Sequence, residues 1–255
     1  MKYNLVKIIA ICFFPLIILL VQMVSPIISI ITGFVFIIGV IALPVFRKML
    51  ILYSIMVFGY LIWKYFSINI YISSELIKII TRFGLFGYIL LFIIWQRIQK
   101  TENSFFNVGN VKDIIRIPFI WKGFREVEWR FTLIFCLLWL CLAVIFTIKN
   151  GFEYNILFYG MLFSIVNALL EEIIWRGFVL TRLTDITSEK IALIVSSLAF
   201  GLYHYSLDFP LLVCFVFAIG GFFMGGSAIK SKGLLSPILM HIAVNIAFVS
   251  IGIIF

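Results

Sequence analysis

Residues 157–180 read LFYGMLFSIVNALLEEIIWRGFVL and combine two properties that rarely occur together. The run is long and apolar enough to cross a bilayer core as a helix, which takes ~20 residues. It nevertheless carries Glu171, Glu172 and Arg176 within one short stretch. A charged residue at membrane depth costs ~2.5–3.5 kcal/mol on insertion scales, so groups of this kind mark functional sites. We therefore interpret the run as a membrane helix that bears the chemistry of the protein.

The composition of the whole chain agrees with a membrane location. Hydrophobic residues make up 64% of the 255 residues and charged residues only 12%, against about 25% charged residues in a soluble domain. Such a chain cannot cover a surface that faces water, but it can cover one that faces lipid. The length fits one helical bundle without a separate soluble domain.

Working outward from the central run, the chain divides into further apolar segments of similar length. They are residues 5–23, 26–45, 49–66, 83–96, 131–148, 157–180, 191–207, 209–229 and 234–255. The fourth segment is short, and residues 67–82 before it fit either an interfacial helix or the first part of a longer fourth span. The sequence thus predicts an all-α, polytopic transmembrane bundle of about 8–9 spans.

The Lys and Arg residues orient this bundle. With the N-terminus in the cytoplasm, alternate crossings place 15 of the 20 cations inside and four outside, while Arg176 lies within a span. Membrane proteins usually carry such an excess of Lys and Arg residues in their cytoplasmic loops. The N-terminus is therefore predicted to be cytoplasmic and the C-terminus to lie on the opposite face. The net charge of +9 follows from this topology, and we expect no nucleic acid as a partner.

The longest polar stretch, residues 97–130, falls on the predicted inside. It mixes basic residues with large aromatic ones such as Phe105, Phe106 and Trp121. This mixture is typical of segments that lie in the headgroup region of a bilayer. We therefore predict an interfacial cytoplasmic loop that ends an N-terminal unit of transmembrane helices, residues 1–130.

Three further polar residues lie in the apolar segments that follow the central run. The only two histidines, His204 and His241, fall in the seventh and ninth segments, and Asn245 follows His241 by one helical turn. At ~1.5 Å of rise per residue, Glu171, His204 and His241 lie about 16, 20 and 12 Å from the inside ends of their segments. We therefore expect three helices to bring polar groups into one layer of the bilayer.

Spacing then predicts which of these groups meet. Glu172 and Arg176 are four residues apart and can pair on one helix face, while Glu171 points about 100° away. A carboxylate beside an imidazole can activate water as a general base. A second imidazole and a carboxamide can donate hydrogen bonds to an oxyanion. These are the parts needed to hydrolyse an amide without a Ser or Cys nucleophile.

Other interpretations of the same residues stay open. Glu171, His204 and His241 could instead bind zinc, because two His and one Glu suffice for a catalytic zinc site, although the H-E-x-x-H motif is absent. A single His in a membrane helix often serves only as a hydrogen bond between helices. Buried ionisable groups also form the proton relays of transporters, but the chain shows none of the repeats that many transporters have.

Three motifs in this region resemble those of the CAAX protease and bacteriocin-processing (CPBP, or Abi) family of intramembrane endopeptidases. That family shows E-E-x-x-x-R, F-x-x-x-H and H-x-x-x-N, and here they read Glu171–Arg176, Phe200–His204 and His241–Asn245. All three are intact and in order. The resemblance covers roughly residues 157–250, within a predicted catalytic transmembrane core of residues 131–255.

The resemblance implies a helical membrane fold with a cavity that faces the cytoplasm. It implies that Glu171 and His204 activate the hydrolytic water and that His241 and Asn245 form the oxyanion site, with Glu172, Arg176 and Phe200 in support. No firmly bound cofactor is implied, and zinc is the possible exception. The expected partners are the lipid bilayer and a peptide or membrane-protein substrate.

The family leaves two functions open for this chain. Eukaryotic relatives cleave prenylated CAAX tails, and bacterial relatives are linked to peptide maturation, signalling-peptide processing and bacteriocin self-immunity. The sequence therefore predicts an intramembrane endopeptidase of the cell membrane. The alternative is a non-enzymatic immunity or scaffold protein that uses the same fold to bind a peptide.

Overall fold

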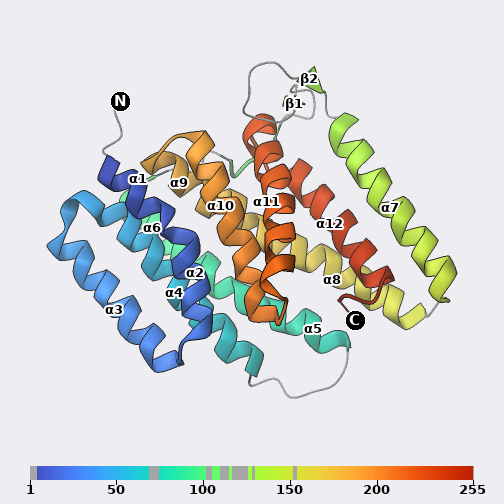
Figure 1. Ribbon diagram of the computed structural model, residues 1–255, viewed down its shortest axis with the longest axis horizontal. Helices are drawn as coiled ribbons and strands as arrows, with labels where there is room; N and C mark the ends of the chain where they lie inside the picture. Colours follow the sequence, from blue (N-terminus) through green and yellow to red (C-terminus); the bar gives the residue numbers. More distant parts are fainter. Residues whose placement is uncertain are drawn as a thin grey trace.

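The computed structural model describes residues 5–68, 75–101, 105–109, 115–116, 126–127, 130–151 and 154–254. These residues form a helical bundle (Figure 1). The α-helices are α1 (Leu5–Cys12), α2 (Phe14–Met23), α3 (Pro26–Ala42), α4 (Arg47–Ile68), α5 (Glu75–Arg82), α6 (Phe86–Gln99), α7 (Arg130–Asn150), α8 (Tyr154–Glu172), α9 (Thr181–Ile186), α10 (Glu189–Tyr203), α11 (Leu211–Ser231) and α12 (Leu235–Ser250). Between α6 and α7, two short strands, β1 (Ile115–Arg116) and β2 (Glu126–Val127), pair antiparallel.

The helices agree with the predicted segments. Within the described part of the chain, six helical stretches are long and apolar enough to cross a membrane, and three shorter apolar helices accompany them: Ile9–Met23, Pro26–Ala42 and Leu235–Ser250. These nine stretches correspond one to one with the nine predicted segments. The prediction of an all-α, polytopic bundle is confirmed, and the protein is a multi-pass membrane protein.

The fourth stretch is longer than its apolar segment suggests. Helix α5, the short turn Phe83–Leu85 and helix α6 form one continuous helical stretch, Leu76–Gln99. Of the two interpretations of the residues before Phe83, the structure favours a longer fourth span. Arg82 is the last residue of α5, but the helical stretch continues beyond it. Its side chain is only 13% exposed and faces Glu171 in the interior. Arg82 is one of the four cations that the predicted topology counts outside, together with Lys64, Lys78 and Lys149, and both Lys78 and Arg82 lie within this helical stretch instead.

Two long-range hydrogen bonds show which helix ends share a face of the bundle. Gln22, at the end of α2, donates from Nε2 to the carbonyl oxygen of Leu202, near the end of α10, at 3.0 Å. Lys78, near the start of α5, donates from Nζ to the carbonyl oxygen of Ile254 at 2.8 Å. These ends form what we call the distal face. It lies opposite the start of α1, as the N and C labels in Figure 1 indicate.

Close contacts between α10 and α11 depend on small residues. A Cβ atom added at Gly221 would lie 2.9 Å from Cδ1 of Phe200, and one at Gly225 would lie 2.7 Å from Cδ1 of Leu193. These two glycines let the helix backbones approach, as the G-x-x-x-G pattern predicts. The close approach holds Phe200, and with it the end of α10, against α11.

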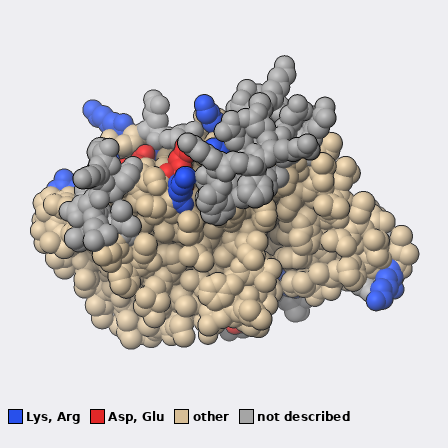
Figure 2. Space-filling model, turned by 45° about the horizontal axis from the view of Figure 1, so that its top comes forward, with Lys and Arg blue, Asp and Glu red and all other residues tan. Residues whose placement is uncertain are grey.

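The outer surface of the bundle is apolar over a broad flank. Figure 2 shows this flank free of charge over most of its area, while Lys and Arg residues gather mainly along the upper edge. Isoleucine side chains on α3, such as Ile27, Ile38 and Ile41, are more than 60% exposed. An apolar exterior of this kind matches a lipid environment.

Most of the predicted interfacial loop 97–130 lies outside the described residues. The part that is described packs against the bundle: Phe105 is buried, and the carbonyl oxygens of Asn107 and Val108 accept hydrogen bonds from the amides of Leu234 and Leu235. Gly109 has a φ of +92° at this contact, a conformation that favours glycine. The interfacial position of the loop and the unit boundary at residue 130 stay predictions.

The predicted topology is open to a direct test. Reporter fusions at Lys48 and within residues 97–130 are expected to give a cytoplasmic signal, and a fusion at Phe255 the opposite signal. The reasons are the bias of the cations and the odd number of apolar stretches. Signals from the same side at Lys48 and Phe255 would contradict nine crossings.

Candidate active site

The two glutamates lie at the end of α8, and the backbone changes immediately after them. Residues Ile173–Leu180 form a π-helical stretch that contains Arg176. Stretches of π-helix are rare and are found frequently at functional sites. The side chains of Glu171, Glu172 and Arg176 are all at most 3% exposed. The sequence thus places three charged groups side by side in the interior.

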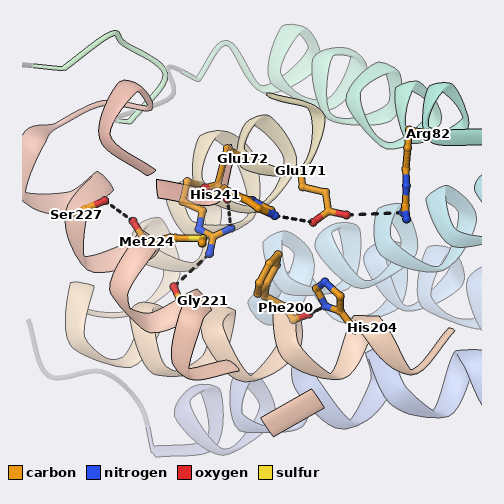
Figure 3. A network of polar contacts seen from close by, with 10 residues as sticks. Arg82, Glu171, Glu172, Phe200, His204, Gly221, Met224, Ser227 and His241 are labelled. Atoms are coloured by element: carbon orange, nitrogen blue, oxygen red, sulfur yellow. Dashed lines mark hydrogen bonds and ion pairs between the residues drawn. The ribbon is translucent and has the colours of Figure 1, made fainter. Parts of the chain in front are cut away.

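Glu172 joins two of the other predicted site residues (Figure 3). Its Oε1 atom accepts a hydrogen bond from Nη1 of Arg176 at 2.7 Å, and it lies 2.7 Å from Nδ1 of His241. Arg176 also donates from Nη2 to the carbonyl oxygen of Gly221 at 3.2 Å, and its guanidinium lies 4.4 Å from the ring centroid of Phe200. The buried Glu172 carboxylate is therefore compensated by a cation four residues along the chain, in the arrangement that its spacing predicts.

Glu171 points to a different set of partners. Its Oε2 lies 3.8 Å from Nε2 of His241, and its Oε1 lies 3.9 Å from Nη1 of Arg82 on α5. Both separations exceed hydrogen-bonding distance. Among the described residues, Oε2 has no hydrogen-bond partner. The carboxylate is thus held between two nitrogen groups and retains an oxygen that can bind water.

His204 begins a short 3₁₀ turn at the end of α10. Its Nδ1 lies 2.9 Å from the carbonyl oxygen of Phe200, which can only accept a hydrogen bond. The hydrogen of the neutral ring is therefore on Nδ1, and Nε2 is left as an acceptor. The rings of Phe200 and Phe217, with centroids at 4.9 and 4.4 Å, fix the orientation of the imidazole.

His241 and Asn245 lie one turn apart on α12, and both are buried. Glu172 binds one ring nitrogen of His241, which turns the other toward Glu171. The Nδ2 atom of Asn245 is buried and has no hydrogen-bond partner among the described residues. A donor in this state is available to a ligand.

A cavity of about 580 Å³ connects these groups, and Glu171, His204, His241 and Asn245 all line it. Most of its remaining wall is apolar and aromatic. At the distal face it is lined by Ser67, Asp208, Ile253 and Ile254. No described residue of the turns on the opposite face, at 43–46, 187–188 and 232–234, lines it. The cavity therefore extends from the buried polar groups to the distal face.

The position of the cavity is incompatible with one of two predictions made from the sequence. The resemblance implies a cavity that faces the cytoplasm, whereas the bias of the cations implies a cytoplasmic N-terminus. The cavity lies on the face opposite the start of α1, so both cannot hold. The reporter fusions described above decide which of them is wrong.

The residues proposed as zinc ligands do not make a metal site in the described part of the chain. No group of three His, Cys, Asp or Glu side chains lies close enough there to hold a metal ion. Glu171 and His241 approach each other, but His204 directs its Nδ1 to the Phe200 carbonyl and is surrounded by aromatic rings. Catalytic zinc needs three protein ligands at about 2.0–2.3 Å, and these three side chains do not provide such a set together in the described structure.

Sequence reasoning missed several polar residues of the cavity wall, Arg82 and Asn167 among them. Arg82 lies in the fourth stretch, outside all three motifs, and Asn167 lies one turn before Glu171 on the same face of α8. The signal for Asn167 was its i, i+4 spacing from Glu171. Arg82 gave no local signal, because it follows Lys78 by one turn in a stretch that resembles the polar end of a helix.

The comparisons with known proteins address the family. Residues 153–247 match the family model described as type II CAAX prenyl endopeptidase Rce1-like. No curated protein and no solved structure matches the chain significantly. The matched segment contains the three motifs, from Glu171 to Asn245, so the predicted resemblance is confirmed, and it indicates an intramembrane endopeptidase in general terms. Residues 153–247 are therefore similar to the type II CAAX prenyl endopeptidase family of membrane proteases.

Proposed function

We propose that the protein hydrolyses a peptide bond within the membrane by means of water activated by Glu171 and His204. The observation that carries this proposal is the shared cavity wall. A buried carboxylate with an oxygen free of hydrogen bonds, an imidazole with an acceptor nitrogen and an amide with a free donor all line one cavity. These are the groups that general base catalysis and oxyanion stabilisation require.

In the first step, a water molecule between Glu171 and His204 attacks the carbonyl carbon of the substrate. Its proton passes to the Glu171 carboxylate as the new C–O bond forms, and Nε2 of His204 accepts the second hydrogen bond of the water. The carbonyl oxygen becomes an oxyanion. Glu171 then returns the proton to the departing amine as the C–N bond breaks. Water is consumed, and a carboxylic acid and an amine are released.

Asn245 and His241 supply the donors for the oxyanion in this scheme. Nδ2 of Asn245 carries free hydrogens that face the cavity. Glu172 accounts for Nδ1 of His241, which leaves Nε2, 3.8 Å from Oε2 of Glu171, as the ring nitrogen on the side of the catalytic carboxylate. Glu172 and Arg176 act by holding this ring in place.

The aromatic wall of the cavity indicates an apolar substrate. Val216 and Ile219 line the cavity and are also 58% and 60% exposed on the outer surface of α11. The cavity therefore reaches the flank of the bundle that faces lipid. A hydrophobic peptide or a segment of a membrane protein suits this environment.

The experiment that tests the function is a peptide-cleavage screen read by mass spectrometry, with purified protein and its Glu171→Ala variant. Cleavage by the parent protein and none by the variant supports an endopeptidase. Peptide binding without cleavage by either protein would favour the immunity or scaffold role instead.

Asn245→Ala is expected to lower kcat by ~10²–10³, the typical effect of removing one oxyanion donor, with little change in KM. Asn155→Ala serves as the matched control, because Asn155 is exposed on α8 and lies away from the cavity. Steady-state kinetics on a peptide found in the screen measure both constants. A raised KM with unchanged kcat would assign Asn245 to substrate binding.

A further inference from the structure

Arg82 has an unusual position for a residue outside the motifs. It ends α5, and its guanidinium lies 5.0 Å from the ring centroid of Phe163 on α8. Its Nη1 is 3.9 Å from Oε1 of Glu171. That separation balances charge but is too long for a hydrogen bond. Arg82 therefore compensates Glu171 without being bound to it.

The guanidinium also has unused donors. Its Nε and Nη1 atoms are buried and have no hydrogen-bond partner among the described residues. Buried donors without partners are costly and rare in native proteins. Arg82 lines the cavity, so a group that enters the cavity can satisfy them.

A second free donor lies on the same wall. Trp63 lines the cavity, and its indole Nε1 has no partner among the described residues. Its Cδ1 atom would lie 3.3 Å from a Cβ at Gly84, two residues after Arg82. The cavity wall thus offers an indole N–H group as well as guanidinium N–H groups without partners among the described residues, and both kinds can only donate.

We propose that Arg82 binds a carboxylate of the substrate, either its C-terminal carboxylate or an acidic side chain close to the bond that is cut. A guanidinium is always charged and matches a carboxylate with two parallel hydrogen bonds. Since Nη1 of Arg82 and Oε1 of Glu171 are 3.9 Å apart, and an extended chain spans ~3.3–3.6 Å per residue, the carboxylate lies within one or two residues of the cleaved bond. This inference rests on the proposed function and gives it a substrate class.

The test uses one apolar peptide that the parent protein cleaves, synthesised in three forms. The first ends in a free carboxylate, the second ends in an amide, and the third ends in an amide but carries Glu near the terminus. Each form is assayed with the parent protein, Arg82→Met, Arg82→Lys and the control Lys64→Met. Lys64 lies near the distal end of α4 and outside the cavity lining, so its variant removes a cation without touching the site.

The parent protein and Lys64→Met are expected to cleave a carboxylate form at least about tenfold faster, in kcat/KM, than the plain amide, in line with one charge-assisted contact. Arg82→Met is expected to lose this preference while still cleaving the plain amide, and Arg82→Lys to retain part of it. Comparison of the first and third forms identifies the source of the carboxylate.

Two results would overturn the inference. One is equal cleavage of all three forms by the parent protein. The other is an equal loss on all three forms in Arg82→Met, which would assign Arg82 to the support of Glu171 alone. Failure of the proposed function looks different, because Glu171→Gln would then cleave as fast as the parent protein.

Discussion

Replacing Glu171 with Gln is expected to abolish peptide hydrolysis while leaving the fold intact. Gln keeps the size of Glu, but its amide cannot accept a proton from water at a useful rate. Loss of a general base typically costs ~10²–10⁴ in rate. The expected residual activity is therefore near the background of the assay. The fold should stay intact, because Glu171 makes no hydrogen bond in the described structure that the substitution would remove. Thermal unfolding of the detergent-solubilised protein checks this expectation.

Two further experiments, a His204→Ala variant and treatment with a chelator, test the same mechanism. His204→Ala should be similarly inactive, because the water loses its hydrogen bond to Nε2 of His204. That nitrogen is the acceptor of the ring, since Nδ1 donates to the Phe200 carbonyl. Treatment with a chelator separates water activation by Glu171 from the zinc alternative. The mechanism proposed above expects activity to survive the chelator, whereas zinc chemistry expects loss of activity and stoichiometric metal in the parent protein. Full activity of Glu171→Gln would end the proposed mechanism.

Some features of the site could be predicted from the sequence because they depend on the local geometry of a single helix. Glu172 and Arg176 pair as their spacing of four predicts, because neighbours at that distance share a helix face. The nine apolar runs predicted the helices because a membrane helix must be apolar over its length. Both inferences use only the regular geometry of one helix.

Other features depend on how separate helices pack, and no local pattern reports that. The contact between His241 and Glu172 joins residues 69 positions apart, and the motifs predicted only a shared depth. Arg82 reaches Glu171 because α5 packs on α8. The position of the cavity at the distal face likewise follows from the packing of several helices. Hydropathy indicates that a helix is in the membrane but not which helix lies beside it.

Glu172→Ala and Arg176→Ala are expected to destabilise the protein as well as inactivate it. Each change leaves a buried charge without its partner, and breaking a buried pair in this way costs roughly 3–5 kcal/mol. Arg176 is 2% exposed and Glu172 is fully buried, so water cannot replace the lost partner. Glu172→Ala also removes the acceptor that orients His241. Thermal unfolding in detergent measures the stability, and the peptide assay measures the activity.

The double variant Glu172→Leu/Arg176→Met separates the effect on stability from the effect on activity. Replacing a buried ion pair by apolar residues of similar size is often neutral or stabilising. The double variant should therefore unfold near the parent temperature, whereas either alanine variant unfolds well below it. Its activity should stay low, because the His241 ring no longer has Glu172 to hold Nδ1. If both single variants unfold like the parent protein, Glu172 and Arg176 are not buried together. If the double variant regains activity, His241 does not need Glu172, and the supporting role proposed for the pair is wrong.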